Sequence, residues 1–236
     1  MPPPAKVCVV VPTYNERGNV APLVASLEGV GVPNLTLLFV DDSSPDGTAD
    51  EVTRLSSHTP WIHLSVRPRK MGIGSAYQDG FKEAIASFGP DVLVEMDAYL
   101  QHPASALPSL LNALEGGADV AVGSRYVPQG GAPGWGLTRR TVSRGANAYA
   151  RIMLGLKVKD ATSGYRAFSR AAAQAVAEAH LPAKGFEFQV ATLNLLKGTW
   201  RVVEVPFTFS RRSAGKSKLG LADAVRFFLA VLRMAL

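Results

Sequence analysis

Charged side chains stand directly after several short apolar runs of this sequence. Asp41 and Asp42 follow one such run, Asp97 follows another, and Arg125 stands near the end of a third. Adjacent carboxylates can accept hydrogen bonds from a base or a ribose, and a carboxylate among oxygen-bearing neighbours suits a hard cation bound to a diphosphate. An arginine after a strand is more often functional than structural, because in an apolar core its charge would lack a partner. Arg125 can therefore bind the same anion. The pattern predicts nucleotide or diphosphate chemistry.

Two further segments carry groups that can contact a nucleotide. Residues 12–16, Pro-Thr-Tyr-Asn-Glu, place polar groups after a proline, which suits a cradle for a planar ligand. Residues 67–74 place three cations before a glycine-rich helix start, where backbone N–H groups can bind phosphate. This segment has Gly-x-Gly without the third glycine of a dinucleotide-binding motif. Asp46 and Thr48 have a simpler role as caps of the next helix.

These residues need structural elements that bring them together. Apolar runs of strand length alternate with helical stretches, which is typical of a mostly parallel sheet with helices on both faces. We expect strands at 7–11, 35–40, 62–66, 92–96 and 119–123, and helices near 19–29, 47–57, 74–87 and 104–115. Ligands of such sheets bind beyond the carboxyl ends of the strands, so the loops there should form one site.

The last part of the chain is expected to add basic loops and a terminal helix. Residues 128–143 open with a Gly- and Pro-rich stretch that predicts a mobile loop, followed by arginines on a helix, and a second basic loop spans 210–219. The final residues predict an amphipathic helix with three charges on one side: Asp223, Arg226 and Arg233. Two interpretations stay open for it, a helix lying on a membrane and one packed on its own domain.

Composition and charge limit the possible functions. The chain has 236 residues, 47% hydrophobic and 19% charged, which indicates a globular domain rather than a disordered chain. Its single Cys8 excludes an internal disulfide, and four His with one Cys exclude a zinc site of ordinary spacing. The net charge of +6 favours an anionic partner. Nucleic acid is disfavoured, since the basic residues lie in loops without a recognition helix or an aromatic platform.

Nine stretches of the chain, taken together and in order, carry a family resemblance. They read VVPTYNERGNV, VDDSSPDGT, GIGSAYQDGF, MDAYLQHP, VGSRYVPQGG, SRGANAYAR, DATSGYRAF, KGFEFQ and GKSKLG. In these motifs the sequence resembles the family-2 glycosyltransferases of the GT-A fold, and within them the dolichol-phosphate or polyprenol-phosphate mannose synthases. The resemblance implies an α/β catalytic domain of the GT-A type over residues 1–219 and an amphipathic membrane-interface helix over 220–236.

The resemblance also implies substrates and the residues that bind them. The donor would be GDP-mannose, the acceptor a polyprenyl (dolichyl) monophosphate, and the product a polyprenyl-phosphate β-mannose formed with inversion. The implied donor-binding residues are Pro12, Tyr14, Glu16, Val40, Asp42, Asp97, Ala98, Tyr99, Gln101, Arg125, Arg212 and Lys218. The implied acceptor-binding residues are Arg139, Ser143, Arg144 and Asn147. Asp97 and Gln101 would bind Mg²⁺ or Mn²⁺, and Arg125 and Asp97 would be catalytic.

One position departs from the family pattern. The metal motif of the family is Asp-x-Asp, whereas this chain has Asp97-Ala98-Tyr99. A phenol with a pKa of about 10 is neutral at pH 7 and is a poor ligand for these cations. Two alternatives therefore stay open: a catalytically impaired variant that binds nucleotide sugars and, because the motifs fix the acceptor better than the sugar, a synthase that uses UDP-glucose.

The resemblance further implies a peripheral protein at the cytoplasmic face of a membrane. The implied partners are the membrane surface and, because many relatives continue into transmembrane helices, a membrane-anchoring subunit. The sequence contains no run of about 18 uncharged apolar residues that could span a bilayer.

Overall fold

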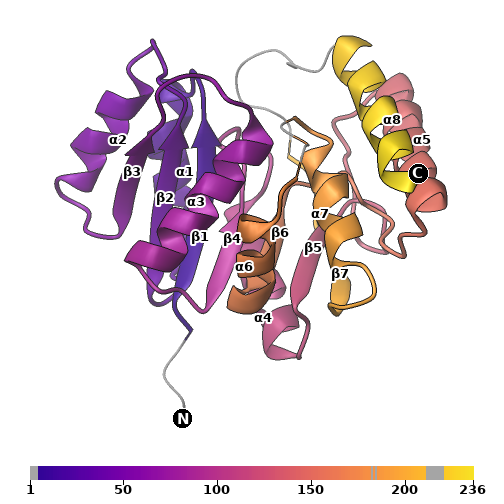
Figure 1. Ribbon diagram of the computed structural model, residues 1–236. Helices are drawn as coiled ribbons and strands as arrows, with labels where there is room; N and C mark the ends of the chain where they lie inside the picture. Colours follow the sequence, from indigo (N-terminus) through magenta and orange to yellow (C-terminus); the bar gives the residue numbers. More distant parts are fainter. Residues whose placement is uncertain (1–4, 182, 184, 211–220) are drawn as a thin grey trace.

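A computed structural model describes residues 5–181, 183, 185–210 and 221–236, which form a seven-stranded sheet with helices on both faces (Figure 1). The strands are β1 (Val7–Thr13), β2 (Leu35–Asp41), β3 (Ile62–Val66), β4 (Val92–Glu95), β5 (Val120–Ser124), β6 (Arg166–Ser169) and β7 (Val202–Pro206). Their order across the sheet is β3-β2-β1-β4-β6-β5-β7. The predicted α/β fold with a mostly parallel sheet is confirmed.

Strand β6 is the exception to the parallel arrangement. It runs antiparallel between β4 and β5, whereas the other strand pairs are parallel. Its register places Arg166 opposite Glu95 of β4 and Val122 of β5. The sequence pattern predicts neither β6 nor β7, because β6 reads Arg-Ala-Phe-Ser rather than as an apolar run and no residue of β7 is fully buried.

The helices bury the sheet from both sides. They are α1 (Arg17–Val30), α2 (Thr48–Ser56), α3 (Ile73–Ser87), α4 (Leu107–Glu115), α5 (Leu137–Leu154), α6 (Arg170–Glu178), α7 (Phe188–Leu196) and α8 (Leu221–Ala235), with a 3-10 helix η1 at Ala104–Ala106. Successive strand residues point to opposite faces, so Val9 joins the core under α1, α2 and α4, whereas Val10 joins the core under α3, α6 and α7. Because both faces are covered, the central strands are continuous apolar runs.

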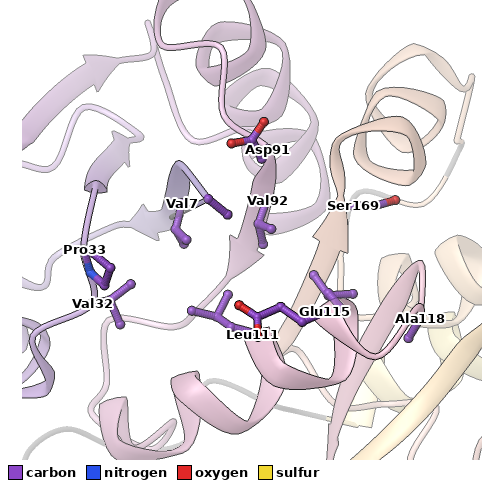
Figure 2. Close-up of a pocket in the computed structure, with 11 residues that line it drawn as sticks. Val7, Val32, Pro33, Asp91, Val92, Leu111, Glu115, Ala118 and Ser169 are labelled. Carbon is purple, nitrogen blue, oxygen red and sulfur yellow. The ribbon is translucent and has the colours of Figure 1, made fainter. Parts of the chain in front are cut away.

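The carboxyl ends of the parallel strands lie at one edge of the sheet. Thr13 at the end of β1 pairs with Asp41 at the end of β2, and Ser124 at the end of β5 pairs with Pro206 of β7. The opposite edge has a hollow of about 340 Å³, lined mainly by apolar side chains at the starts of β1 and β4 (Figure 2). Asp42, Asp97 and Arg125 lie instead at or just after the carboxyl ends of β2, β4 and β5.

Helix α5 begins where the Gly- and Pro-rich stretch ends. It starts at Leu137, so Arg139, Arg140 and Arg144 lie on a helix that follows the loop, as the sequence predicts. The stretch 128–136 holds six Gly or Pro residues among nine, whereas the next Gly or Pro after it is Gly145. The end of the Gly- and Pro-rich stretch therefore marks the helix start.

Helix α8 packs on the domain through one side. Phe227 and Val231 are buried, and Tyr149 of α5 donates a hydrogen bond to the carbonyl oxygen of Phe228 (3.1 Å). Four apolar side chains of α8 are 40–51% exposed: Val225, Phe228, Leu229 and Leu232. The helix thus packs on its own domain and leaves an apolar row exposed. Across the described ranges, no helix is long and apolar enough to cross a membrane.

Candidate active site

The two adjacent carboxylates after β2 have different roles. Asp41 is fully buried and accepts hydrogen bonds from Thr13 Oγ1 (2.8 Å) and from the N–H of Ser44 (2.8 Å). It therefore ties the loop after β2 to the end of β1. Asp42, one residue further, is the carboxylate that reaches the neighbouring loop after β3.

Asp42 forms a buried ion pair with Arg67, and both side chains are less than a tenth exposed. Nε of Arg67 donates to Oδ1 of Asp42 (2.6 Å), while the N–H of Met71 donates to Oδ2 (3.1 Å). The remaining guanidinium nitrogens donate to groups at the start of α3: Ser75 Oγ (2.8 Å), Asp79 Oδ2 (3.0 Å) and the carbonyl of Gly72 (3.1 Å). From the sequence, Arg67 was expected among the cations that bind a phosphate, whereas in the structure its hydrogen-bond partners are groups of the protein itself.

Four other residues that are predicted to bind the sugar-nucleotide donor lie near this ion pair, at the ends of β1 and β2. Tyr14 follows β1, and Nζ of Lys70 lies 4.3 Å from the centre of its ring. Glu16 is buried, and its carboxylate accepts a hydrogen bond from Asn19 (2.8 Å). Pro12 and Val40 are paired neighbours on β1 and β2. The structure therefore gathers the five predicted residues at the ends of two adjacent strands.

Asp97 is held by its own loop after β4. Its N–H donates to Nδ1 of His102 (3.1 Å), and its Oδ1 accepts the N–H of Tyr99 (3.1 Å). Burial lowers the pKa of His102, and the charge of Asp97 opposes this only in part. The imidazole is therefore neutral at pH 7 with Nδ1 as the acceptor. Leu100 has φ +60°, a backbone strain that is often found at functional sites.

The donor set at Asp97 fits a divalent cation that is shared with a substrate. Asp97 is partly exposed, whereas Gln101 is 5% exposed and its Nε2 donates weakly to the carbonyl of Ser210 (3.5 Å). No cluster of three or more His, Cys, Asp or Glu that could hold a metal ion occurs within the described residues. One carboxylate with phosphate oxygens is a common environment for Mg²⁺, so the residues present are sufficient in kind.

A buried charged pair lies beneath Asp97. Glu95 and Arg166 are fully buried on neighbouring strands, and Arg166 donates to three backbone carbonyls, those of Ser163, Ala161 and Gln189. Burial raises the pKa of Glu95 to about 7, against the charge of Arg166, and burial lowers the pKa of Arg166 to about 10. Arg166 of the SGYR motif thus bonds Gln189 of the EFQ motif. Neither Glu95 nor Arg166 was assigned a role from the sequence.

Arg125 is anchored on Asp160 and stays charged. Nε and Nη2 donate to the two carboxylate oxygens of Asp160 (2.7 and 2.5 Å), and Nη2 also donates to Thr162 Oγ1 (3.0 Å). Burial disfavours the charge, but the hydrogen bonds and charge of Asp160 outweigh it and raise the pKa of Arg125. Nη1 has no hydrogen-bond partner in the part of the chain that the structure describes. The guanidinium therefore retains donors for a ligand.

The loop after β4, which carries Asp97 and His102, and Arg125 after β5 both contact Phe209. The ring of Phe209 lies 5.9 Å from the ring of His102 and 5.5 Å from Cζ of Arg125. Nε2 of His102 lies 3.5 Å from Oδ2 of Asp97, so the imidazole ring stands between this carboxylate and Phe209. Neither His102 nor Phe209 has a role in the sequence analysis, although His102 lies in the same loop as Asp97.

The predicted acceptor residues lie along the first half of α5. Ser143 accepts a hydrogen bond from the phenol of Tyr126 (2.8 Å), and Arg139 and Arg144 are exposed. Asn147 is buried and its amide bonds Thr162 through both of its ends (3.0 Å each). It therefore connects α5 to the Arg125 anchor. Arg212 and Lys218, predicted for the donor phosphates, lie outside the described residues.

The fold and the carboxyl-edge site define a GT-A glycosyltransferase domain. A glucosyl-3-phosphoglycerate synthase from Mycobacterium tuberculosis in complex with UDP superposes with a TM-score of 0.68 at 19% identity, covering 98% of this chain and 80% of that chain. The structure of another mycobacterial protein superposes with a TM-score of 0.72 at 17% identity, covering 98% and 75%. Residues 8–176 match the family described as Glycosyl transferase family 2, and the chain belongs to this family.

Curated relatives are similar over most of the chain. A polyprenol monophosphomannose synthase of Mycolicibacterium smegmatis is 40% identical over 219 residues, 92% of this chain and 82% of the relative. An undecaprenyl-phosphate mannosyltransferase of Micrococcus luteus is 40% identical over 91% of this chain and 87% of the relative. A dolichol-phosphate mannosyltransferase of Pyrococcus furiosus is 40% identical over 91% of this chain and 59% of the relative.

Proposed function

We propose that this chain transfers mannose from GDP-mannose to a polyprenyl monophosphate with inversion at the anomeric carbon. The observation that carries the proposal is that His102, which accepts the N–H of Asp97, and Arg125 both lie against the ring of Phe209, so that a carboxylate for a cation stands near a guanidinium for phosphate. The names of the three relatives, which describe mannosyl transfer to polyprenol, undecaprenol or dolichol phosphates, support this sugar and this acceptor class.

The reaction needs charge neutralisation more than it needs a base. A phosphate oxygen of the acceptor attacks the anomeric carbon, and the bond from that carbon to the diphosphate breaks, with its electron pair leaving on GDP. A phosphate monoester has a second pKa of about 6, so the nucleophile is already an anion at pH 7. Arg125, with donors still available, stabilises the negative charge that develops on the diphosphate. We assign Arg212 and Lys218 to the same task.

The metal ion belongs to this proposal as well. Asp97 and the amide oxygen of Gln101 would hold Mg²⁺ or Mn²⁺ together with the donor diphosphate, and the cation supplies neutralisation of the leaving group when it is bound. Pro12, Tyr14, Glu16, Val40 and Asp42 hold the guanosine, with Lys70 over the Tyr14 ring beside them. Ser143, Arg139 and Arg144 face the acceptor phosphate, and Asn147 positions their helix.

Transfer of radiolabelled mannose from GDP-mannose to a polyprenyl phosphate in detergent tests the proposal. The assay uses this chain and Tyr99→Asp, each with Mg²⁺, Mn²⁺ or EDTA. We expect at least 10-fold faster transfer by Tyr99→Asp with either cation, since a second carboxylate then binds the metal. Tyr99→Asn, which removes the phenol without adding a carboxylate, is the matched control at the same position. Absence of transfer by both proteins, with GDP-mannose bound and the fold intact, would refute the proposed function.

Tyr99 supports a second candidate, a protein that binds nucleotide sugars without transferring them. Tyr99 occupies the position of the second carboxylate, and its N–H is used to hold Asp97. Absence of mannosyl transfer by this chain, together with transfer by Tyr99→Asp, would support this candidate. Competition between GDP-mannose and UDP-glucose in the same assay decides the donor, since UDP-glucose is the alternative that the motifs leave open.

We also propose peripheral association with the cytoplasmic face of a membrane, where a polyprenyl phosphate resides, with or without an anchoring subunit. The exposed apolar row on α8 (Val225, Phe228, Leu229 and Leu232) supports it. Flotation with phosphatidylglycerol vesicles should retain the chain, and Phe228→Ser with Leu229→Ser should release it. Equal flotation of both proteins would contradict the membrane role of α8.

A further inference from the structure

The stretch 128–136 carries a tryptophan that contacts two arginines from different elements. Trp135 has Cζ of Arg139 at 4.1 Å from its ring centre and Cζ of Arg125 at 5.0 Å. Both distances lie within the range of a cation–π interaction. Arg125 follows β5 on the sheet, whereas Arg139 is in the first turn of α5. One ring therefore connects a cation of the sheet edge with a cation of the helix.

The chain holds this ring firmly in place. Gly131 and Phe207 share a backbone hydrogen bond (3.0 Å), and the N–H of Phe209 donates back to Gly131 (2.8 Å). The indole packs edge-to-face on Phe209 at 5.3 Å. Its Nε1 is buried without a hydrogen-bond partner in the described ranges. The indole is thus fixed by packing and by its position in the loop.

The contact brings two like charges together. The two ring distances set an upper limit of about 9 Å between the guanidinium carbons of Arg125 and Arg139. Arg125 is fixed by Asp160, whereas Arg139 is exposed and its long side chain has many alternative rotamers in water. Asp160 weakens the repulsion between the two cations, and the ring of Trp135 adds an attractive contact to both guanidinium groups.

We propose that Trp135 is a positioning residue that holds Arg139 at a fixed distance from Arg125, so that the acceptor phosphate is placed against the donor diphosphate. The inference rests on the proposed function, in which these two arginines serve the two phosphates. It adds Trp135 to the site as a residue that orients the two arginines and does not itself bind either substrate. Loss of the ring leaves both charges in the chain but removes their fixed spacing.

A double-mutant cycle in the transfer assay tests this coupling. Trp135→Leu keeps apolar volume and removes the ring face, and we expect about a 10-fold rise in KM for farnesyl phosphate with a smaller change in kcat. Arg139→Ala should give a similar rise, and the double variant should be no worse than Arg139→Ala alone. Trp135→Phe should restore part of the affinity. Additive losses, or a Trp135→Leu effect equal to that of Trp200→Leu, would overturn the proposal.

A second measurement tests the contact independently of activity. With Trp61→Phe and Trp200→Phe in the background, Trp135 is the remaining tryptophan, since the chain has three. We expect Arg139→Ala to shift its fluorescence emission, and Arg144→Ala, five residues along the helix and over the ring of Tyr126 rather than that of Trp135, to leave it unchanged. Equal emission in all three proteins would refute the contact. If the parent chain and Tyr99→Asp transferred no mannose, the proposed function would fail, while the emission result would still decide whether Trp135 holds Arg139.

Discussion

Two buried arginines at the same edge of the sheet, Arg67 and Arg125, are each paired with an aspartate but differ in what remains available to a ligand. Arg67 directs Nε and both Nη nitrogens to Asp42 and to groups at the start of α3. Arg125 concentrates Nε and Nη2 on Asp160 and Thr162, and aromatic rings cover its face. Both side chains are less than a tenth exposed. We call the first guanidinium closed, because all its nitrogens bind protein groups, and the second open, because its Nη1 has no hydrogen-bond partner among the described residues.

The difference shows how one type of ion pair can leave different groups available in two halves of the sheet. Arg67 connects the loops after β2 and β3, where the guanosine is proposed to bind. Arg125 is fixed by a bidentate anchor on Asp160 that leaves Nη1 without a hydrogen-bond partner among the described residues, which suits its proposed role as a preorganised phosphate ligand. Burial does not separate the two arginines, whereas the number of nitrogens that bind protein groups does.

The largest effect is expected from breaking the closed pair. Arg67→Met leaves Asp42 buried without its cation, which should lower the free energy of unfolding by about 3–5 kcal/mol. Urea denaturation measures this, with the exposed Arg69→Met as the matched control, for which we expect less than about 0.5 kcal/mol. Equal midpoints for the two variants would show that Arg67 does not hold the loops together.

The open pair should respond in rate rather than in stability. Arg125→Lys keeps the charge but cannot bridge Asp160 and Thr162 and still face a phosphate, so kcat/KM for mannosyl transfer should fall about 10²–10³-fold, or about 3–4 kcal/mol. Arg140→Lys is the matched control, and the Tyr99→Asp background gives the signal. A variant that unfolds earlier but transfers at the parent rate would place Arg125 in the same class as Arg67.

A third buried arginine, Arg166, differs from the other two because it donates no hydrogen bond to the neighbouring carboxyl group of Glu95. Arg166, Tyr77 and Gln189 face Glu95 from β6, α3 and α7. The pKa of Glu95 is raised in the folded state to about 7, so the folded chain binds the proton more tightly than the unfolded chain. The stability that this provides is present at low pH and is lost as the pH rises through about 7.

Glu95→Gln should remove this pH dependence. Between pH 4.5 and pH 8 in EDTA, the unfolding free energy of the parent should fall relative to Glu95→Gln by roughly 3 kcal/mol. Urea denaturation at several pH values measures the difference, and the exposed Glu28→Gln is the control. Parallel curves for the parent and Glu95→Gln would mean that Glu95 stays ionised beside Arg166 throughout.

The sequence predicts the parallel half of the fold well, since a strand buried on both faces is a continuous apolar run. It predicts the gathering of Asp42, Asp97 and Arg125 for the same reason, because parallel strands end at one edge. Strand β6 escapes prediction because its four residues are stable only between two neighbours that are far away in the sequence. The burial of Arg166 on this strand is therefore not predicted from the sequence either.

The partners of the predicted residues could not be predicted either. Asp160 lies 35 residues from Arg125, and Arg67 lies 25 residues from Asp42, so no local spacing indicates which charges meet. His102 is the exception, because it stands in the loop of Asp97 and a turn of that length can bring it back. The part of the site that depends on long-range pairing appears only when the sheet is assembled.

The smallest expected effect compares two hydroxyl groups that accept a hydrogen bond from the two arginines. Ser75 accepts from Nη1 of Arg67 (2.8 Å), and Thr162 accepts from Nη2 of Arg125 (3.0 Å). Ser75→Ala and Thr162→Ala should each cost about 1 kcal/mol of unfolding free energy. Only Thr162→Ala should also lower kcat/KM, by about 3–10-fold, because Thr162 holds both Arg125 and Asn147 of α5. If Ser75→Ala slowed transfer as much as Thr162→Ala, Arg67 would have to act on the reaction too, and the distinction between a closed and an open guanidinium would fail.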